Sequence, residues 1–240
     1  TEKSVIDIDG LILGAPAAGE ILLSPDEKDM GVILIDVGGG ITDISVFHKK
    51  RLVFYDSIPV GGDHITNDIS IGLKIPYTEA EKIKRQYELA LTSLIMNDQD
   101  ISVIDINENR KKDIKVSEVV EIIEARVYEI FSLCRNMLSR EDIRVGSGAG
   151  VVLAGGGISY VDGCKQLCGE VFELPVRVAS YSAIGVSKPE FALAAGMIRY
   201  ASGLHRKSTV GSGVRLRKEA VDKEEAGFWS KITKLLGRFF

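Results

Sequence analysis

The sequence predicts an α/β fold with a small α+β insertion and an amphipathic helix at its C-terminal end. Two observations predict the main fold: three strand-like runs joined by short turns lie in residues 31–60, and strands alternate with helices after residue 147. A hairpin pattern and a long helical pattern within residues 73–147 predict the insertion. We therefore expect a main domain of residues 1–72 and 148–201 and a small subdomain of residues 73–147.

The composition is that of a globular protein and excludes several classes. Of the 240 residues, 45% are hydrophobic and 27% are charged, which excludes a disordered or fibrous chain. No apolar run approaches the ~20 residues of a membrane-spanning helix. The three cysteines are too few for a disulfide framework and are expected to be reduced thiols of a cytosolic protein. Residues 1–202 carry a net charge of −9 and residues 203–240 one of +5, so no basic stripe crosses the folded part and nucleic-acid binding is excluded.

Three strands begin the predicted sheet. Residues 31–37, GVILIDV, are a continuous apolar run typical of a buried strand. Three glycines separate this run from the β-branched segment ITDISVF, and a charged KKR turn leads to LVFYDSIPV. Because strands joined by short turns pair antiparallel, we expect a three-stranded meander, not the strand-to-helix step of a dinucleotide site. The first 30 residues are expected to add a strand or helix and a turn.

Helices and strands follow in alternation. A helix is expected to start near Asp63, and another to cover Thr78–Ser93, where Thr78 and Glu81 form a capping box. Residues 101–116 predict a hairpin, and Ser117–Arg140 carries one buried apolar stripe at helical spacing. The remaining segments are expected to be a strand in VVLAGGG, a helix at Tyr160–Cys168, a strand in PVRVAS and a helix at Pro189–Ser202.

The first glycine loop, Asp36-Val-Gly-Gly-Gly-Ile-Thr-Asp43, lies between two predicted strands. Glycines without a Cβ let successive backbone N–H groups approach an anion, and such concave nests hold phosphates. Asp36 at the strand end could hold a Mg²⁺ ion through water, and Thr42 and Asp43 could add a hydroxyl and a second carboxylate. The alternative is a glycine-rich turn with two solvated acids.

A second glycine loop makes the pattern more specific. LAGGGIS, residues 153–159, again runs from a buried strand into three glycines and then a helix, whose N-terminus suits an anion or the ribose-phosphate edge of a nucleotide. Between the two loops, PVGG at Pro59–Gly62 leads into the helix near Asp63. The two clusters together predict a nucleotide site more specifically than either does alone.

The C-terminal end differs from the rest of the chain. Residues 202–227 are polar and aperiodic, which predicts a flexible linker. Residues 228–240, FWSKITKLLGRFF, place apolar and cationic side chains on opposite faces of a helix, with aromatic rings at both ends. We predict that this helix lies in an anionic membrane surface, the alternative being docking on protein. The side chains expected to contact the membrane are Phe228, Trp229, Lys231, Ile232, Lys234, Leu235, Leu236, Arg238, Phe239 and Phe240.

The motifs IDVGGGITD and LAGGGIS resemble the second phosphate loop and the adenosine loop of the actin-like ATPase superfamily. The segment PVGGDHITNDISIGLKIPYTEAEKIK is similar to the FtsA family of bacterial cell-division proteins, as is an amphipathic tail behind a flexible linker. The resemblance covers the chain from about Gly31 onward and lacks the family's N-terminal half. It implies an actin-like (ribonuclease-H-like) ATPase fold, with residues 1–72 and 148–201 as domain 2A and the start of the return to domain 1, and residues 73–147 as domain 2B.

The resemblance also implies roles for individual residues. Asp36 would be the catalytic acid, associated with Mg²⁺ through water. Glu81 and Lys84, three apart on one helix face, would bracket the ribose and adenine of ATP, with Arg85 as a weaker candidate; solvated helix charges are the alternative. The loop residues expected to contact the nucleotide are Gly38, Gly39, Gly40, Thr42, Gly61, Gly62, Gly155, Gly156 and Gly157.

Two departures from the family pattern limit the expected ATPase activity. Ile41 stands where many relatives have a threonine after the third glycine, which removes one hydroxyl from the phosphate site. The other phosphate loop belongs to the family's first half, so this chain would supply one wall of the nucleotide cleft. We expect at most a weak ATPase, because phosphoryl transfer depends on positioning the phosphates from both sides.

The function implied by the resemblance is that of a cell-division protein on the cytoplasmic face of the cell membrane, at the septum. It would bind ATP, self-associate into filaments and tether the FtsZ ring, whose C-terminal peptide the small subdomain would receive. Arg126 is a candidate contact for this peptide, or else a solvated residue. The alternatives are an enzyme of the superfamily, such as a chaperone ATPase or a sugar kinase, and an assembly scaffold of pili or compartments. The cationic tail favours the division protein.

Overall fold

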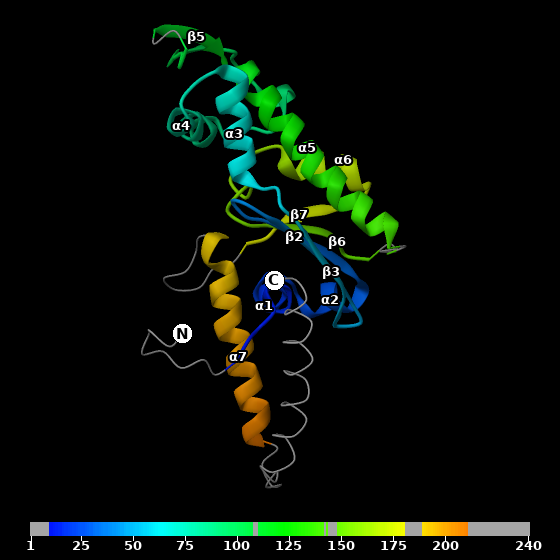
Figure 1. Cartoon of the computed structure of the whole chain (residues 1–240). Helices are drawn as coiled ribbons and strands as arrows, with labels where there is room; N and C mark the ends of the chain where they lie inside the picture. The colour runs from blue at the N-terminus through cyan, green and yellow to red at the C-terminus, as the bar shows by residue number, and fades with distance from the viewer. Residues whose placement is uncertain (1–9, 108–109, 142, 144–147, 181–188, 211–240) are drawn as a thin grey trace, which may run out of the picture. The chain divides into compact units, whose positions relative to one another are not determined.

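The computed structural model describes residues 10–107, 110–141, 143, 148–180 and 189–210, and Figure 1 shows how their helices and strands are arranged. The strands are β1 (Val32–Val37), β2 (Thr42–His48), β3 (Arg51–Ile58), β4 (Asp100–Ile104), β5 (Lys111–Lys115), β6 (Gly150–Ala154) and β7 (Val176–Val178). The α-helices are α1 (Gly14–Leu22), α2 (Pro25–Met30), α3 (Gly62–Leu73), α4 (Tyr77–Tyr87), α5 (Val116–Arg140), α6 (Cys164–Phe172) and α7 (Ala192–Val210). Short 3₁₀ turns lie at Thr92–Leu94 and Pro189–Phe191.

One sheet holds five strands in the order β3-β2-β1-β6-β7. β1, β2 and β3 pair antiparallel, which confirms the predicted meander, whereas β6 pairs parallel with β1, and β7 pairs parallel with β6. The carboxyl ends of parallel strands meet at the same end of a sheet, and this is where open α/β sheets bind ligands. The two glycine loops follow β1 and β6, so the topology places them side by side.

Strand β1 is buried on both faces, which explains its uninterrupted apolar run. Ile33, Ile35 and Val37 belong to a core shared with α3, α5 and α6, whereas Val32 and Leu34 belong to a second core shared with α1. The residues alternate because successive side chains of a strand point to opposite faces of the sheet. Figure 1 shows α3, α5 and α6 on one side of the sheet and α1 on the other.

The predicted insertion contains α4, the β4–β5 hairpin and α5, and the paired strands confirm the hairpin prediction. Its buried side chains, among them Ile114, Val119 and Ile130, belong to the same core as those of the sheet. The three cysteines are free and buried, in line with a packing role. Among the described residues, no helix is both long and apolar enough to cross a membrane.

The helix predicted at Thr78–Ser93 corresponds to α4, and its details were wrong. α4 begins at Tyr77, directly after Pro76, and no side chain caps its first turn. The predicted capping box does not form, because Thr78 already lies inside the helix. α4 ends at Tyr87, since the next residue adopts a left-handed backbone conformation with φ of 42°.

Two other boundaries also differ from the prediction. The helix predicted at Tyr160–Cys168 begins only at Cys164, because Gly163, with φ of 93°, holds the chain in a turn before it. The last helix, α7, continues beyond Ser202 to Val210, so the first part of the predicted linker at 202–227 is helical. No proline interrupts that stretch. The rest of the linker and the whole predicted membrane helix lie outside the described residues.

Candidate functional site

Both glycine loops line a cavity of about 480 Å³ at one end of the sheet. The cavity brings together groups far apart in the sequence: the first loop with its two acids, the start of α3, one face of α4 and the second loop. The predicted site residues that line it are Asp36, Gly38, Gly39, Gly62, Glu81, Lys84, Arg85, Gly155, Gly156 and Gly157. Most of the predicted nucleotide contacts therefore lie on one surface.

The first glycine loop is clamped by the N-terminus of α3. The N–H of Gly62 donates to the carbonyl of Gly38 at 2.9 Å, and that of Asp63 donates to the carbonyl of Gly39 at 2.8 Å. These bonds satisfy two of the helix N–H groups that have no partner within the helix. The contact requires glycine at position 61, because a Cβ there would lie 2.6 Å from both of these carbonyl oxygens.

The second glycine loop packs against the first one, backbone to backbone. The N–H of Gly157 donates to the carbonyl of Val37 at 2.8 Å, and a Cβ on Gly157 would lie 2.5 Å from the carbonyl oxygen of Gly38. Gly155 has φ of 94°, and a Cβ on it would collide with Val37 and with the carboxylate of Asp36. The prediction that a helix follows this loop directly was wrong, because α6 begins at Cys164. The helix N-terminus beside both loops is that of α3.

Asp36 and Asp43 stand directly opposite each other on β1 and β2, at the cavity. Burial and the nearby charge of Asp43 raise the pKa of Asp36 from 3.8 to about 6. The hydroxyl of Tyr55 donates to Asp43 at 3.0 Å, whereas no cationic side chain of the described residues forms an ion pair with Asp36. An uncompensated, half-buried carboxylate of this kind favours the approach of a cation.

These acids fit Mg²⁺ held through water. In the part of the chain that the structure describes, no group of three His, Cys, Asp or Glu side chains could enclose a metal ion. Mg²⁺ does not need such a cage, since it usually takes one or two carboxylates and fills its other positions with water and phosphate oxygens. Asp36, with Asp43 as its neighbour, offers that donor set beside a loop suited to phosphate.

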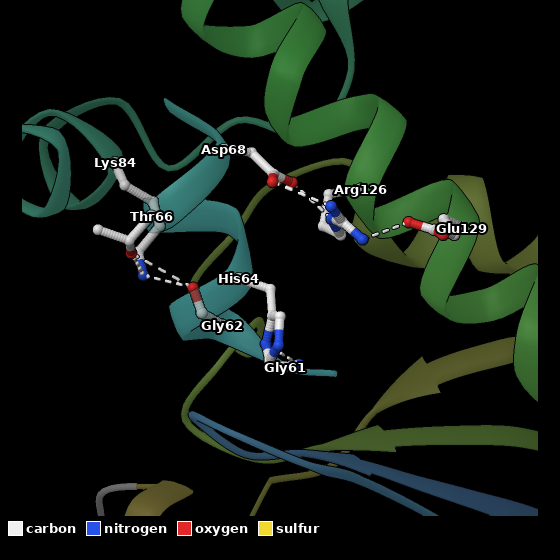
Figure 2. Close-up of polar contacts among 8 residues, drawn as sticks. All are labelled: Gly61, Gly62, His64, Thr66, Asp68, Lys84, Arg126 and Glu129. Atoms are coloured by element: carbon white, nitrogen blue, oxygen red, sulfur yellow. Dashed lines mark hydrogen bonds and ion pairs between the residues drawn. The ribbon is translucent and has the colours of Figure 1, made fainter. Parts of the chain in front are cut away.

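A charged network on α3 and α4 forms another wall of the cavity, as Figure 2 shows in part. The Lys84 ammonium lies 2.7 Å from Glu81 and donates to the carbonyl of Gly62 at 3.0 Å and to the hydroxyl of Thr66 at 2.6 Å. Burial alone would raise the pKa of Glu81, but hydrogen bonds from Lys84, Thr66 and Arg85 outweigh it and lower the pKa to about 2. Glu81 and Lys84 are thus not merely solvated helix charges.

Three predicted contacts do not line the cavity. Thr42 is fully buried, and its hydroxyl donates to the carbonyl of Val60 at 2.7 Å, so its expected role toward phosphate is not supported. Gly61 supports the first loop from behind, as described above. Gly40 is exposed at the tip of that loop, where a Cβ would meet no atom within 4 Å.

Arg126 is neither a free receptor group nor a solvated residue. Its guanidinium binds both carboxylate oxygens of Asp68 on α3, at 2.5 and 2.9 Å, and one oxygen of Glu129 at 2.5 Å (Figure 2). The side chains of Arg126 and Asp68 are only 24% and 25% exposed. The pair therefore links the helix that begins at the cavity to the long helix α5.

The site also contains residues that sequence reasoning missed. Asp63 was expected only as a helix start, yet it lines the cavity, and its carboxylate lies beside Gly39. Tyr160, three residues after the last glycine of the second loop, also lines the cavity. Thr66, which lies one helical turn after Gly62, carries the hydroxyl that contacts both Glu81 and Lys84. The segment GGDHIT held the signal for Asp63 and Thr66, because residues one turn apart at a helix start share a face.

Known proteins with a similar sequence belong to a family of cell-division proteins. The family model described as "Cell division protein FtsA" matches residues 33–196. The cell division protein FtsA of Bacillus subtilis is 38% identical over 222 residues, which are 92% of this chain and 50% of that protein. The FtsA of Pseudomonas aeruginosa is 34% identical over 208 residues, 85% of this chain and 49% of that protein. The chain thus spans about half the length of the curated relatives it matches.

Solved structures show the fold. MreB5 of Spiroplasma citri bound to ADP superposes with a TM-score of 0.65 at 21% identity, over 83% of this chain and 61% of that one. The same protein bound to AMPPNP gives a TM-score of 0.64. At this identity the similarity establishes an actin-like α/β fold and no more.

Proposed function

The chain belongs to the FtsA family of cell-division proteins, and we propose that it binds ATP with Mg²⁺ in the cavity between its two glycine loops. ATP acts here mainly as a conformational ligand, with hydrolysis weak at most. The observation that carries the proposal is the convergence of two glycine loops, the N-terminus of α3, an acid pair and the Glu81–Lys84 pair on one cavity.

Each wall of the cavity has a separate task in this proposal. The glycine loops offer backbone N–H groups to the phosphates, since Cβ atoms would block the close approach. Asp36 holds Mg²⁺ through water, and the ion neutralises phosphate charge when bound. Glu81 and Lys84 hold the ribose and adenine side of the nucleotide, a carboxylate accepting from hydroxyl groups and an ammonium donating to acceptors.

The test of the nucleotide site uses a glycine that tolerates a side chain. The nearest atoms to a Cβ on Gly39, which lines the cavity, would be those of the Asp63 carboxylate, at 3.1 Å or more, so Gly39→Ala should fold after a small shift of that side chain. If the loop wraps the phosphates, the added methyl group collides with them. We expect binding of a fluorescent ATP analogue in the presence of Mg²⁺ to weaken about tenfold, equivalent to about 1.4 kcal/mol. Gly10→Ala, where a Cβ meets no atom within 4 Å and which lies outside the cavity, is the control.

Two results would contradict this proposal. If the unmodified chain does not bind the analogue, the cavity is not a nucleotide site under the conditions tested. If the unmodified chain binds and Gly39→Ala binds equally well, the first loop does not enclose the phosphates.

At the level of the whole protein, we propose that the chain tethers FtsZ filaments to the cytoplasmic face of the cell membrane at the division septum. Residues 228–240 attach to anionic lipid through a cationic, aromatic-rich helix. Self-association into filaments supplies multivalency, since one short helix binds lipid weakly and many helices on one polymer bind strongly. The α3–α5 region that contains Arg126 receives the FtsZ C-terminal peptide, and the Asp68–Arg126 pair must then open or be bridged by the peptide.

A further inference from the structure

Thr66 is a fully buried threonine in the second turn of α3 that faces the Glu81–Lys84 pair. Its hydroxyl oxygen lies 2.6 Å from the Lys84 ammonium, 2.5 Å from Glu81 Oε2 and 3.3 Å from the Gly62 carbonyl oxygen. Figure 2 shows Thr66 and Lys84 pointing toward each other, with Gly62 completing the group. The hydroxyl of a threonine inside a helix commonly bonds to the carbonyl three or four residues before it, or faces solvent.

The hydrogen-bond inventory assigns a direction to each contact. An ammonium group only donates and an ionised carboxylate only accepts, whereas a hydroxyl does both. Lys84 therefore donates to the Thr66 oxygen, and the Thr66 proton goes to Glu81, which is the shorter and charge-assisted bond. The hydroxyl thus fixes the two charged groups relative to each other and to α3.

We propose that Thr66 is a positioning residue for the nucleotide site: its hydroxyl holds the Glu81 carboxylate and the Lys84 ammonium at the cavity wall. The inference rests on the proposed function and adds to it the residue that pre-organises the nucleoside side. Thr66 itself does not line the cavity, so it acts through its two partners.

The burial of these side chains explains why a third group is needed. Lys84 is 11% exposed and Glu81 is 27% exposed, whereas Arg85, the other partner of Glu81, is 76% exposed. Without the Thr66 hydroxyl, Arg85 draws the carboxylate toward solvent and Lys84 keeps only one contact to α3, the Gly62 carbonyl. Both side chains have several rotatable bonds, so ligand binding must then order them.

The test compares variants that keep or remove the Thr66 hydroxyl. Thr66→Val removes it with little change in volume, and Thr66→Ser keeps it. Ser70→Ala is the control, because it removes a hydroxyl–carbonyl bond of 2.7 Å from the same helix, outside the cavity. Binding of Mg–ATP and of Mg with inorganic triphosphate is measured on the full chain, together with stability toward urea. Thr66→Ala serves if Thr66→Val does not fold.

We expect Thr66→Val to bind Mg–ATP about tenfold more weakly, the size of one charge-assisted hydrogen bond, and Thr66→Ser to stay within about twofold. Inorganic triphosphate should bind both variants equally, since it lacks the nucleoside that Glu81 and Lys84 hold. Ser70→Ala should lose stability but keep its affinity for ATP.

Equal ATP binding by the unmodified chain and Thr66→Val would overturn the inference while leaving the proposed function in place. Parallel losses of ATP and triphosphate affinity would also overturn it, because they would indicate general damage to the cavity. Failure of the unmodified chain to bind ATP would overturn the proposed function, and the inference with it.

Discussion

Replacing Asp36 by asparagine should stabilise the fold at neutral pH while it removes the proposed Mg²⁺ ligand. Burial and the charge of Asp43 raise the pKa of Asp36 from 3.8 to about 6, so the ionised carboxylate opposes folding. The folded chain therefore binds this proton more tightly than the unfolded chain, and stability falls as the pH rises from about 4 to about 6. A shift of about two units corresponds to about 3 kcal/mol at pH 7 and to less than about 1 kcal/mol at pH 4.

The asparagine amide is itself half-buried, which reduces the gain, so we expect Asp36→Asn to be about 2–3 kcal/mol more stable than the unmodified chain at pH 7. The assay is urea unfolding at pH 7 and pH 4, followed by circular dichroism, because the single tryptophan, Trp229, lies in the tail. Asp113→Asn, at an exposed position on β5, is the control and should change little. Addition of Mg–ATP should stabilise the unmodified chain more than Asp36→Asn. No gain at pH 7, or an equal gain at pH 4, would refute the reasoning.

Three other predictions follow from the same structure. Gly61→Ala should lower the free energy of unfolding by about 2 kcal/mol, because its Cβ would meet two backbone carbonyls that cannot move aside. Gly40→Ala should lower it by less than about 0.5 kcal/mol. Equal costs for the two variants in urea unfolding would contradict this prediction. Asp68→Asn should lower the free energy of unfolding by about 1–2 kcal/mol, because it removes the charge that binds Arg126 through both carboxylate oxygens. Glu79→Gln, from an exposed pair with Lys82, should leave the free energy of unfolding almost unchanged. Equal urea unfolding of the two variants would contradict this prediction. Deleting residues 228–240 should abolish co-sedimentation with anionic vesicles. In the unmodified chain, the emission of Trp229 should shift to shorter wavelength with anionic lipid, and the shift should be smaller at high salt. Persistent binding after the deletion would exclude the tail as the anchor.

Local sequence patterns predicted the secondary structure correctly where residues that are neighbours in sequence are also neighbours in space. The apolar run of β1 and the short turns predicted the meander, and the buried apolar stripe of Ser117–Arg140 predicted α5 to within one residue. Boundaries failed where a single backbone conformation decided them. The turn at Gly163 delays α6, and the left-handed residue after Tyr87 ends α4 early. Such conformations depend on what the surrounding chain permits, which a periodic pattern does not record.

In the candidate site, too, some residues could be predicted from sequence and others only from the folded chain. The glycine loops and Asp36 could be found from sequence, because two glycine clusters at strand ends form a more specific pattern than either alone, and an acid beside one of them fits a phosphate-bound cation. The proposed roles of Glu81 and Lys84 are implied by a family resemblance, since their spacing alone equally fits a solvated helix. Their contact with Thr66, 15 and 18 residues earlier, appeared only in the folded chain.

The sequence by itself determined the α/β class, the two glycine loops and the meander, because each depends on residue type and local spacing, and its motifs resembled those of a cell-division family. Only the tertiary structure decided that α3, not α6, meets the second loop, that Arg126 is held by Asp68 across 58 residues, and that burial beside Asp43 raises the pKa of Asp36. The physical reason is that hydrogen-bond partners, burial and electrostatic fields are set by groups distant along the chain, and only packing brings those groups together.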